Sequence, residues 1–257
     1  MSKARNPGAK ERLSVAQVIA ELKANGSAQT RKTYRNAGIR GEIFGVKYEF
    51  LKKLHKRVKT DHELALGLWE TGVLDARTFA CWVADADKTT IKLLESWARD
   101  ESQPHIAGEL AAYVQDTNLA VGRMRKWIGM KSAYRQTLGW SIAGKLVMQP
   151  DRGPEEGGVD DVDVADLLRR IEDGIQTAPN GTRYVMNSTL IGIGCRPGWM
   201  RKAIAVARKV GKVDVDFGKR SCKVKDAETT IRHTIDHYKK QGKKPTDGTA
   251  GQRRRHC

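Results

Sequence analysis

Apolar residues recur at helical spacing along almost all of this 257-residue chain, in segments of about ten to fifteen residues. Short clusters rich in glycine, proline, asparagine or aspartate separate these segments. The first one shows the pattern: Ser14 can cap a helix whose apolar stripe contains Val15, Val18, Ile19 and Leu22. Repeated along the chain, this pattern predicts an all-α fold.

The predicted helices start at residues that can cap or open a helix, and they cover approximately 14–23, 28–36, 47–58, 62–69, 76–84, 89–98, 104–114, 119–128, 132–147, 163–177, 182–193, 197–210 and 226–240. Asp61, Asp75, Asn118 and Asp226 are predicted caps, and Asp87 is predicted to start the helix at 89–98. The only β-like piece is 212–217. Antiparallel helix pairs of this kind can stack into a solenoid. Because no strict sequence period is present, an irregular helical bundle stays open as the alternative.

The charge is large and unevenly distributed. The formal net charge is +17, which is typical of proteins that bind nucleic acid or an anionic membrane surface, or that have a ribosomal or tail-driven role. Basic residues dominate 1–60, 119–150 and 181–257, whereas acidic residues dominate 61–118 and 151–180. The alternation favours one basic face assembled from distant segments. The alternative is that the blocks scatter over the folded surface.

The sequence also predicts a compartment and a domain organisation. No apolar run approaches membrane-spanning length and the N-terminal segment lacks the apolar core of a signal peptide, so we expect a cytoplasmic protein with reduced thiols and no membrane partner, nucleoid-associated in a bacterium. Residues 1–12 are expected to form a basic arm and 13–240 a single helical domain, with 150–161 as a surface loop. Residues 241–257 are expected to be a disordered basic tail.

Four segments carry a resemblance to a known family: FGVKYEFLKKL at 44–54, YRQTLGWSIAGKLV at 134–147, MNSTLIGIG at 186–194 and GKVDVDFGKRSCKVKDA at 211–227. Together they are similar to the AlkD-like DNA alkylation repair family, over about 38–238 of this chain, and the last two segments are the most specific. The resemblance implies an α-α superhelix of HEAT-like antiparallel helix pairs whose basic concave face holds duplex DNA. It implies no cofactor, and we expect a monomer that binds duplex DNA, including alkylated duplex.

Characterised members of that family are DNA glycosylases that release cationic bases alkylated at N3 or N7. Such a base is already a good leaving group, so the enzyme mainly stabilises an oxocarbenium-like sugar and positions a water, tasks suited to a carboxylate. The family uses a Trp and an Asp four residues apart, and an Arg on a later helix. The alignment places Pro104, Gly108 and Gln136 at these three positions. The remaining catalytic candidates are therefore Glu101, Glu109 and Arg135. Glu101 lies four residues after Trp97.

The DNA-contact candidates are the basic residues around the glycine-rich link at 38–45, the acid-free stretch at 119–150 and the basic loop before the last helix. They are Arg35, Arg40, Lys47, Arg123, Lys126, Trp127, Lys131, Arg135, Arg183, Lys219, Arg220, Lys223 and Lys225. A charged loop is often only solvated, and a Trp at helical spacing is often core, so both readings stay open for these residues.

His233 and His237 are four apart on one predicted helix, but with Cys195 and Cys222 they match no standard zinc pattern, and no metal is expected. The function favoured by the resemblance is a DNA-binding DNA alkylation repair protein, with release of cationic alkylated purines from duplex DNA as the activity in question. One alternative is a nucleic-acid-binding or scaffold solenoid without catalysis. Another is a helical adaptor whose basic face meets an acidic protein.

Overall fold

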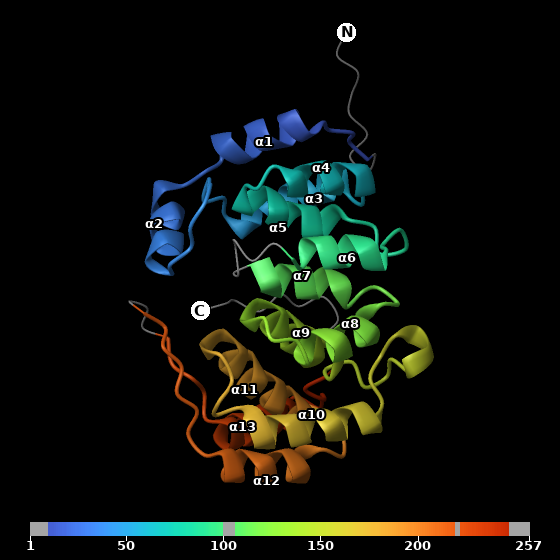
Figure 1. Ribbon diagram of the computed structural model, residues 1–257, viewed down its shortest axis with the longest axis vertical. Helices are drawn as coiled ribbons and strands as arrows, with labels where there is room; N and C mark the ends of the chain where they lie inside the picture. Colours follow the sequence, from blue (N-terminus) through green and yellow to red (C-terminus); the bar gives the residue numbers. More distant parts are fainter. Residues whose placement is uncertain (1–9, 100–105, 219–221, 247–257) are drawn as a thin grey trace. The chain divides into compact units, whose positions relative to one another are not determined.

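The computed structural model describes residues 10–99, 106–218 and 222–246. Over these ranges the regular structure is helical, with thirteen α-helices and one short 3-10 helix (Figure 1). No strand is formed by the described residues, and one isolated antiparallel bridge joins Gly26 and Val46. The all-α prediction is therefore confirmed. The chain divides into two compact units, one ending at Tyr113 and the other beginning at Val114, and each is described by itself.

The first unit contains α1 (Val15–Ala24), α2 (Ala28–Asn36), α3 (Tyr48–Val58), α4 (His62–Glu70), α5 (Leu74–Val83), α6 (Ile91–Trp97) and most of α7 (Ala107–Val114). The predicted caps Ser14 and Asp61 are confirmed, since their side chains accept hydrogen bonds from the backbone N–H groups of Gln17 and Leu64. Its core includes stacked rings of Trp69 and Trp97, whose centroids are 4.2 Å apart.

Three predicted helix starts are wrong. Asp75 lies inside the first turn of α5, whose N-cap is Val73, because its carboxylate is used elsewhere in the fold. Thr90, not Asp87, caps α6 through a hydrogen bond from the backbone N–H of Leu93. Asn118 does not cap α8, whose N-cap is Leu119 and has no side-chain cap bond. In all three cases a polar residue at a plausible spacing does not cap the helix, and another residue occupies the N-cap position.

The second unit contains α8 (Ala120–Ile128), α9 (Ala133–Leu146), η2 (Pro154–Glu156), α10 (Asp161–Gly174), α11 (Asn180–Cys195), α12 (Met200–Val210) and α13 (Ala227–Lys240). Ser132 and Asp226 cap α9 and α13 as predicted, through the backbone N–H groups of Arg135 and Thr229. The 212–217 segment is extended but is assigned to no strand.

Helix pairs repeat along the second unit, and side-chain bonds join neighbouring pairs. The first helices of successive pairs are joined by Arg125 with Asp163 and by Lys209 with Glu172, residues 38 and 37 apart. The second helices α9 and α11 are joined by Thr189 with the backbone of Trp140, 49 apart. Asn187 on α11 donates to the backbone of Lys225, 38 apart, in the loop before α13. These bonds place one helix pair beside the next, with separations of 37 and 38 residues between the first helices and 49 residues between α9 and α11.

Small residues bring the parallel second helices close together. A Cβ on Gly194 of α11 would lie 2.4 Å from Cδ1 of Ile231 on α13, and one on Gly144 of α9 would lie 2.9 Å from Oγ1 of Thr189 on α11. Both distances are shorter than real Cβ contacts, so a larger residue at either position would force the neighbouring side chain to move. Gly194, the last residue of the family-like MNSTLIGIG segment, thus has a packing role.

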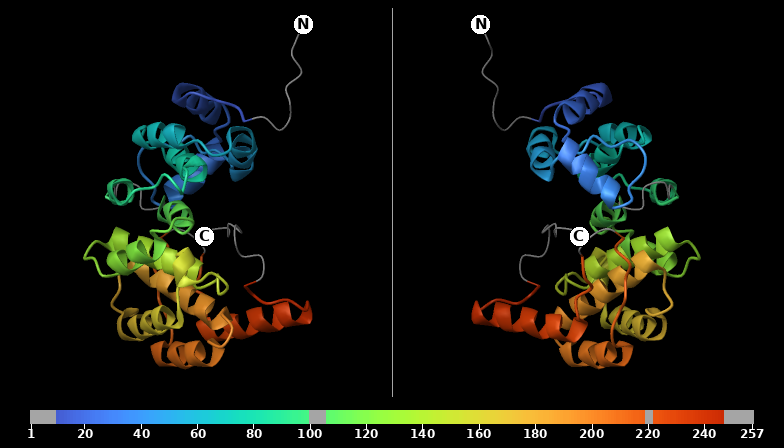
Figure 2. Two further views of the ribbon diagram at one scale, coloured as in Figure 1. Left: turned by 90° about the vertical axis from the view of Figure 1, so that its right-hand side faces the viewer. Right: turned by 90° about the vertical axis from the view of Figure 1, so that its left-hand side faces the viewer.

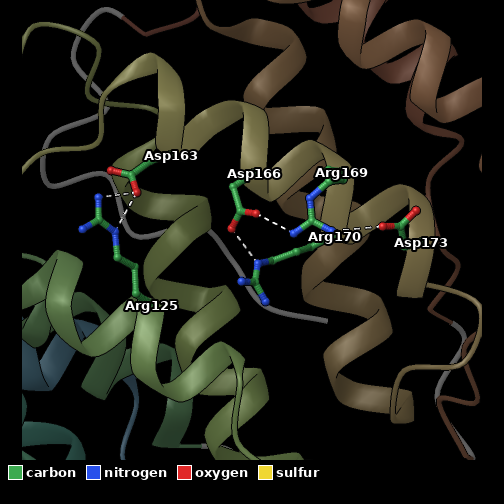
Figure 3. Close-up of polar contacts among 6 residues, drawn as sticks. All are labelled: Arg125, Asp163, Asp166, Arg169, Arg170 and Asp173. Atoms are coloured by element: carbon green, nitrogen blue, oxygen red, sulfur yellow. Dashed lines mark hydrogen bonds and ion pairs between the residues drawn. The ribbon is translucent and has the colours of Figure 1, made fainter.

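The seam between the first helices is polar. Arg125 on α8 reaches Asp163 on α10 with an N···O distance of 2.7 Å, and Asp163 is buried (Figure 3). Further along α10, Asp166 binds both Arg169 and Arg170, and Arg169 also reaches Asp173. The second group is a chain of ion pairs on the exposed face of α10, and each of these pairs contributes little to stability.

The last helix, α13, extends beyond the helices on which it packs. Its buried residues are Ala227 and Ile231, both in the first half, and the second half projects away from α11 and α12 (Figure 2). None of the helices in the described part of the chain is both long and apolar enough to cross a membrane.

Candidate nucleic-acid interface

The N-terminal ends of α9 and α11 lie side by side in the second unit. Thr182 Oγ1 is 2.9 Å from Thr137 Oγ1 and donates to the carbonyl oxygen of Ala133 at 3.3 Å. Lys131 just before α9 is exposed, whereas Arg135 in its first turn is half-buried, with Nη1 3.5 Å from the sulfur of Met130. Because helix N-termini carry partial positive charge, these cations and the two helix ends all favour the binding of an anion.

The basic loop, residues 211–226, is fastened to α11 by side-chain bonds to its backbone. Asn180 makes two of them, from Nδ2 to the carbonyl oxygen of Asp216 (2.7 Å) and from the Asp216 N–H to Oδ1 (2.8 Å). Arg183 donates to the carbonyl oxygen of Asp214 (2.8 Å) and Asn187 to that of Lys225 (3.0 Å). A loop without a strand partner is thereby held in a defined path.

Side chains of the basic loop alternate between the protein and solvent. Val213 is buried, Val215 and Phe217 are half-buried, and Lys212, Asp214 and Asp216 between them are exposed. The returning limb repeats the pattern, with Val224 half-buried between exposed Lys223 and Lys225. This is the two-residue period of extended chain, and it directs the lysines outward. Within the described ranges, neither Lys223 nor Lys225 forms an ion pair.

The predicted DNA-contact residues of the second unit fall into distinct environments. Lys126, Lys131, Lys223 and Lys225 are exposed, and Arg123 and Arg135 are half-buried. Arg183 is half-buried and both of its terminal nitrogens donate to backbone carbonyl groups, so its visible role is to hold the basic loop. Trp127 is fully buried, which places its ring in the core rather than on a binding surface, and Trp140 is also core. Lys219 and Arg220 lie outside the described residues.

In the first unit, Glu109 at the start of α7 is buried and accepts hydrogen bonds from two aromatic side chains. Trp82 Nε1 donates to Glu109 Oε2 at 2.7 Å, and the Tyr48 hydroxyl group donates to Oε1 at 3.0 Å. The rings of Tyr48 and Trp82 are 5.6 Å apart, and Tyr48 is 37% exposed. Tyr48 and Trp82 were not among the sequence candidates. A carboxylate beside aromatic side chains is suited to a cation.

A second buried carboxylate orders the chain that leads to Tyr48. The Asp75 carboxylate accepts the backbone N–H groups of Phe44 (2.7 Å), Gly45 (3.2 Å) and Val46 (2.7 Å). Gly45 has φ +76°, and a Cβ there would lie 2.7 Å from the carbonyl oxygen of Ser27. Burial, and then the charges of Asp75 and Glu109, raise the pKa of Tyr34. Asp75 thus fixes the start of α3.

The remaining candidates of the first unit are Arg35, Arg40 and Lys47, all exposed. Arg35 donates to the carbonyl oxygens of Ile39 (3.0 Å) and Gly41 (2.8 Å), so it also shapes the glycine-rich link. Glu101 and Pro104 lie outside the described residues. Gly108 and Gln136 stand at family positions without a carboxylate or a guanidinium, and Gln136 donates to the carbonyl oxygen of Met130 at 2.6 Å.

Comparison with known proteins gives consistent results. The family model described as DNA alkylation repair enzyme matches residues 18–227. A protein of Listeria innocua, described as uncharacterized, is 32% identical over 222 residues, 84% of this chain and 94% of the relative. A similar protein of Listeria monocytogenes is 31% identical over 230 residues, 87% of this chain and 98% of the relative.

A solved structure matches with a TM-score of 0.81 and 25% identity, over 92% of this chain and all of the other. It is described as belonging to a new family of proteins related to the HEAT-like repeat DNA glycosylases, with affinity for branched DNA structures. The match to this structure identifies the fold as HEAT-like, and the resemblance seen in the sequence is confirmed. By the match over residues 18–227, this chain belongs to the DNA alkylation repair enzyme family.

Proposed function

We propose that the protein binds DNA through the phosphate backbone, using the basic loop and the N-terminal ends of α9 and α11. The observation that carries the proposal is the attachment of the basic loop. Asn180, Arg183 and Asn187 hold its backbone while Lys223 and Lys225 stay exposed and without an ion pair among the described residues. Pre-ordered cations lose little conformational entropy when they bind phosphate groups.

The solved relative supports DNA as the partner, since its family is described as having affinity for branched DNA structures. Branched DNA and plain duplex share the same phosphate backbone, so both are ligands for a surface that reads charge rather than base edges. We therefore propose DNA of either form as the ligand, bound by a monomer in the cytoplasm.

Salt dependence tests this proposal. The affinity for a duplex should fall linearly with the logarithm of salt concentration, and each of Lys223→Ala and Lys225→Ala should reduce the slope by about 1. Lys209→Ala is the matched control, because Lys209 is neutralised by Glu172 at 2.7 Å. An affinity that does not respond to salt, or equal effects of all three substitutions, contradicts backbone binding by the basic loop.

A second candidate function is excision of cationic alkylated purines at the Glu109 site of the first unit. It is favoured by one observation: a buried carboxylate with a Tyr and a Trp donating to its two oxygens. The carboxylate would face positive charge developing on the sugar, and the aromatic rings would face the cationic base.

Release of 7-methylguanine or 3-methyladenine from methylated duplex, beside an undamaged duplex, tests the second candidate. Glu109→Gln should abolish release, whereas Glu49→Gln, at an exposed position of α3, should preserve it. Release that survives Glu109→Gln excludes Glu109 as the catalytic carboxylate. Salt-dependent DNA binding without any base release identifies a DNA-binding member of the family that has no glycosylase activity.

A further inference from the structure

A cavity of about 600 Å³ lies beneath the basic loop in the second unit. Its walls come from both limbs of the loop, from α12 through Ala207 and Arg208, and from the start of α13 through Ala227 and Glu228. Cavities that bind small organic groups are typically about 300–1,000 Å³. The size of this one is therefore sufficient for a ligand larger than an ion or a few water molecules.

The inner walls of the cavity are apolar. Val213, Val215, Phe217 and Val224 line it, and all except Val213 keep part of their surface exposed. The ring of Phe217 is fixed by an edge contact with Tyr184, 5.5 Å between centroids. Half-exposed apolar side chains around a recess favour a planar or apolar group that removes them from water.

One polar side chain in the wall of this cavity keeps an unused acceptor. Asn187 is 3% exposed and lines the cavity, and its Nδ2 donates to the carbonyl oxygen of Lys225 at 3.0 Å. That bond assigns the amide orientation and leaves Oδ1 as an acceptor, which receives no hydrogen bond from any described residue. An acceptor of this kind in the cavity wall can receive an N–H group of a ligand.

The charges around the cavity point to a ligand that is also anionic. Its acids are already engaged: Asp214 with Lys212, Glu228 with Arg208, and Asp226 with the first turn of α13. Lys223 and Lys225 are the lining cations that form no ion pair with the described residues. The rim of the cavity therefore carries an excess of positive charge, whereas the interior is apolar and has one hydrogen-bond acceptor, Asn187 Oδ1.

We propose that this cavity binds the base of a single unstacked nucleotide in a DNA strand, with the adjacent phosphates on Lys223 and Lys225. A nucleobase is planar, has an apolar face for Phe217 and the valines, and carries N–H groups for Asn187 Oδ1. The phosphates on either side match the lysines at the rim. The inference rests on the proposed DNA binding and adds the DNA feature that the basic loop selects.

The test compares three duplexes of equal length: fully paired, with one bulged adenosine, and with a bulged abasic residue. The bulged adenosine should be bound about tenfold more tightly than the other two, the gain expected from stacking one base on an aromatic side chain. Val215→Trp, which fills the cavity, should remove this preference, so that bulged and paired duplexes bind with equal affinity. Val162→Trp is the control, because Val162 is 76% exposed on α10.

Phe217→Ala is a second variant, which should reduce the preference to less than about threefold by removing the stacking surface. A bulged abasic residue bound as tightly as bulged adenosine overturns the proposal, and so does a preference that survives both substitutions. Salt-dependent binding of the paired duplex with no preference for the bulge refutes the nucleotide cavity alone. Loss of binding to every duplex refutes the proposed DNA binding itself.

Discussion

The indole N–H of Trp82 donates a hydrogen bond of 2.7 Å to the buried carboxylate of Glu109, which joins the end of α5 to the start of α7. The same carboxylate receives the Tyr48 hydroxyl group, so three helices of the first unit meet at one charged group. Burying a carboxylate is costly unless its oxygens are hydrogen-bonded. The stability of this unit and the geometry of the Glu109 site are therefore coupled.

Trp82→Phe should lower the free energy of unfolding by about 1–3 kcal/mol, because it leaves Oε2 of a buried carboxylate without its indole donor. Urea-induced unfolding followed by circular dichroism measures the change. Tyr48→Phe is the comparison, and its effect should be smaller because Tyr48 is 37% exposed and water can replace its hydroxyl group. Equal effects of the two substitutions would argue against burial as the reason.

Asp75→Asn should destabilise the first unit by about 2–4 kcal/mol, since an amide offers only one acceptor to the three N–H groups that the carboxylate binds. Hydrogen exchange should show the loss of protection at the backbone N–H groups of Phe44 and Val46. Asp87→Asn, at an exposed position, is the matched control and should leave exchange unchanged. Unaltered protection in Asp75→Asn would show that the carboxylate does not order this segment.

Asn180→Ala should loosen the basic loop without unfolding the second unit, because it removes both side-chain bonds to Asp216. Exchange at the Asp216 N–H should accelerate about tenfold, the equivalent of one hydrogen bond near 1.4 kcal/mol. DNA affinity should fall as well, since the lysines must then be ordered on binding. Asn118→Ala, on the surface of the same unit, is the control. A looser loop with undiminished affinity would separate loop order from DNA binding.

Glu228→Gln should destabilise the junction of α12 and α13 in a pH-dependent way. Hydrogen bonds from Arg208 and then Arg232 lower the pKa of Glu228 from 4.5 to about 2. A lowered pKa in the folded state means that the stabilisation is complete above about pH 4.5 and is lost as the pH falls toward 2. The melting temperatures of the wild type and the variant should therefore differ at pH 7 and converge as the pH approaches 2. A difference that stays constant over this range would exclude the ionised pair as its source.

Much of the local structure follows from the sequence alone. Ser14, Ser27 and Asp226 cap helices because each needs only an extended backbone and an N–H group three residues later, and both are local properties. The glycines of the link at 38–45 have positive φ, which is also a local property, because glycine adopts this backbone conformation without steric cost. The two most specific family-like segments, 186–194 and 211–227, contain the glycines of α11 and the basic loop.

Other features depended on contacts between residues far apart in the chain. Asp75 has the same spacing as a cap, yet its carboxylate binds backbone N–H groups about 30 residues earlier. Lys126 and Trp127 are neighbours in the sequence, but one is exposed and the other fully buried, because helix packing decides which side of α8 faces α9. The local sequence determined where helices form and which residues carry charge. Only tertiary packing decided that Glu109 lies under Tyr48 and Trp82, and that Asn187 faces a cavity, since both relationships join separate helices.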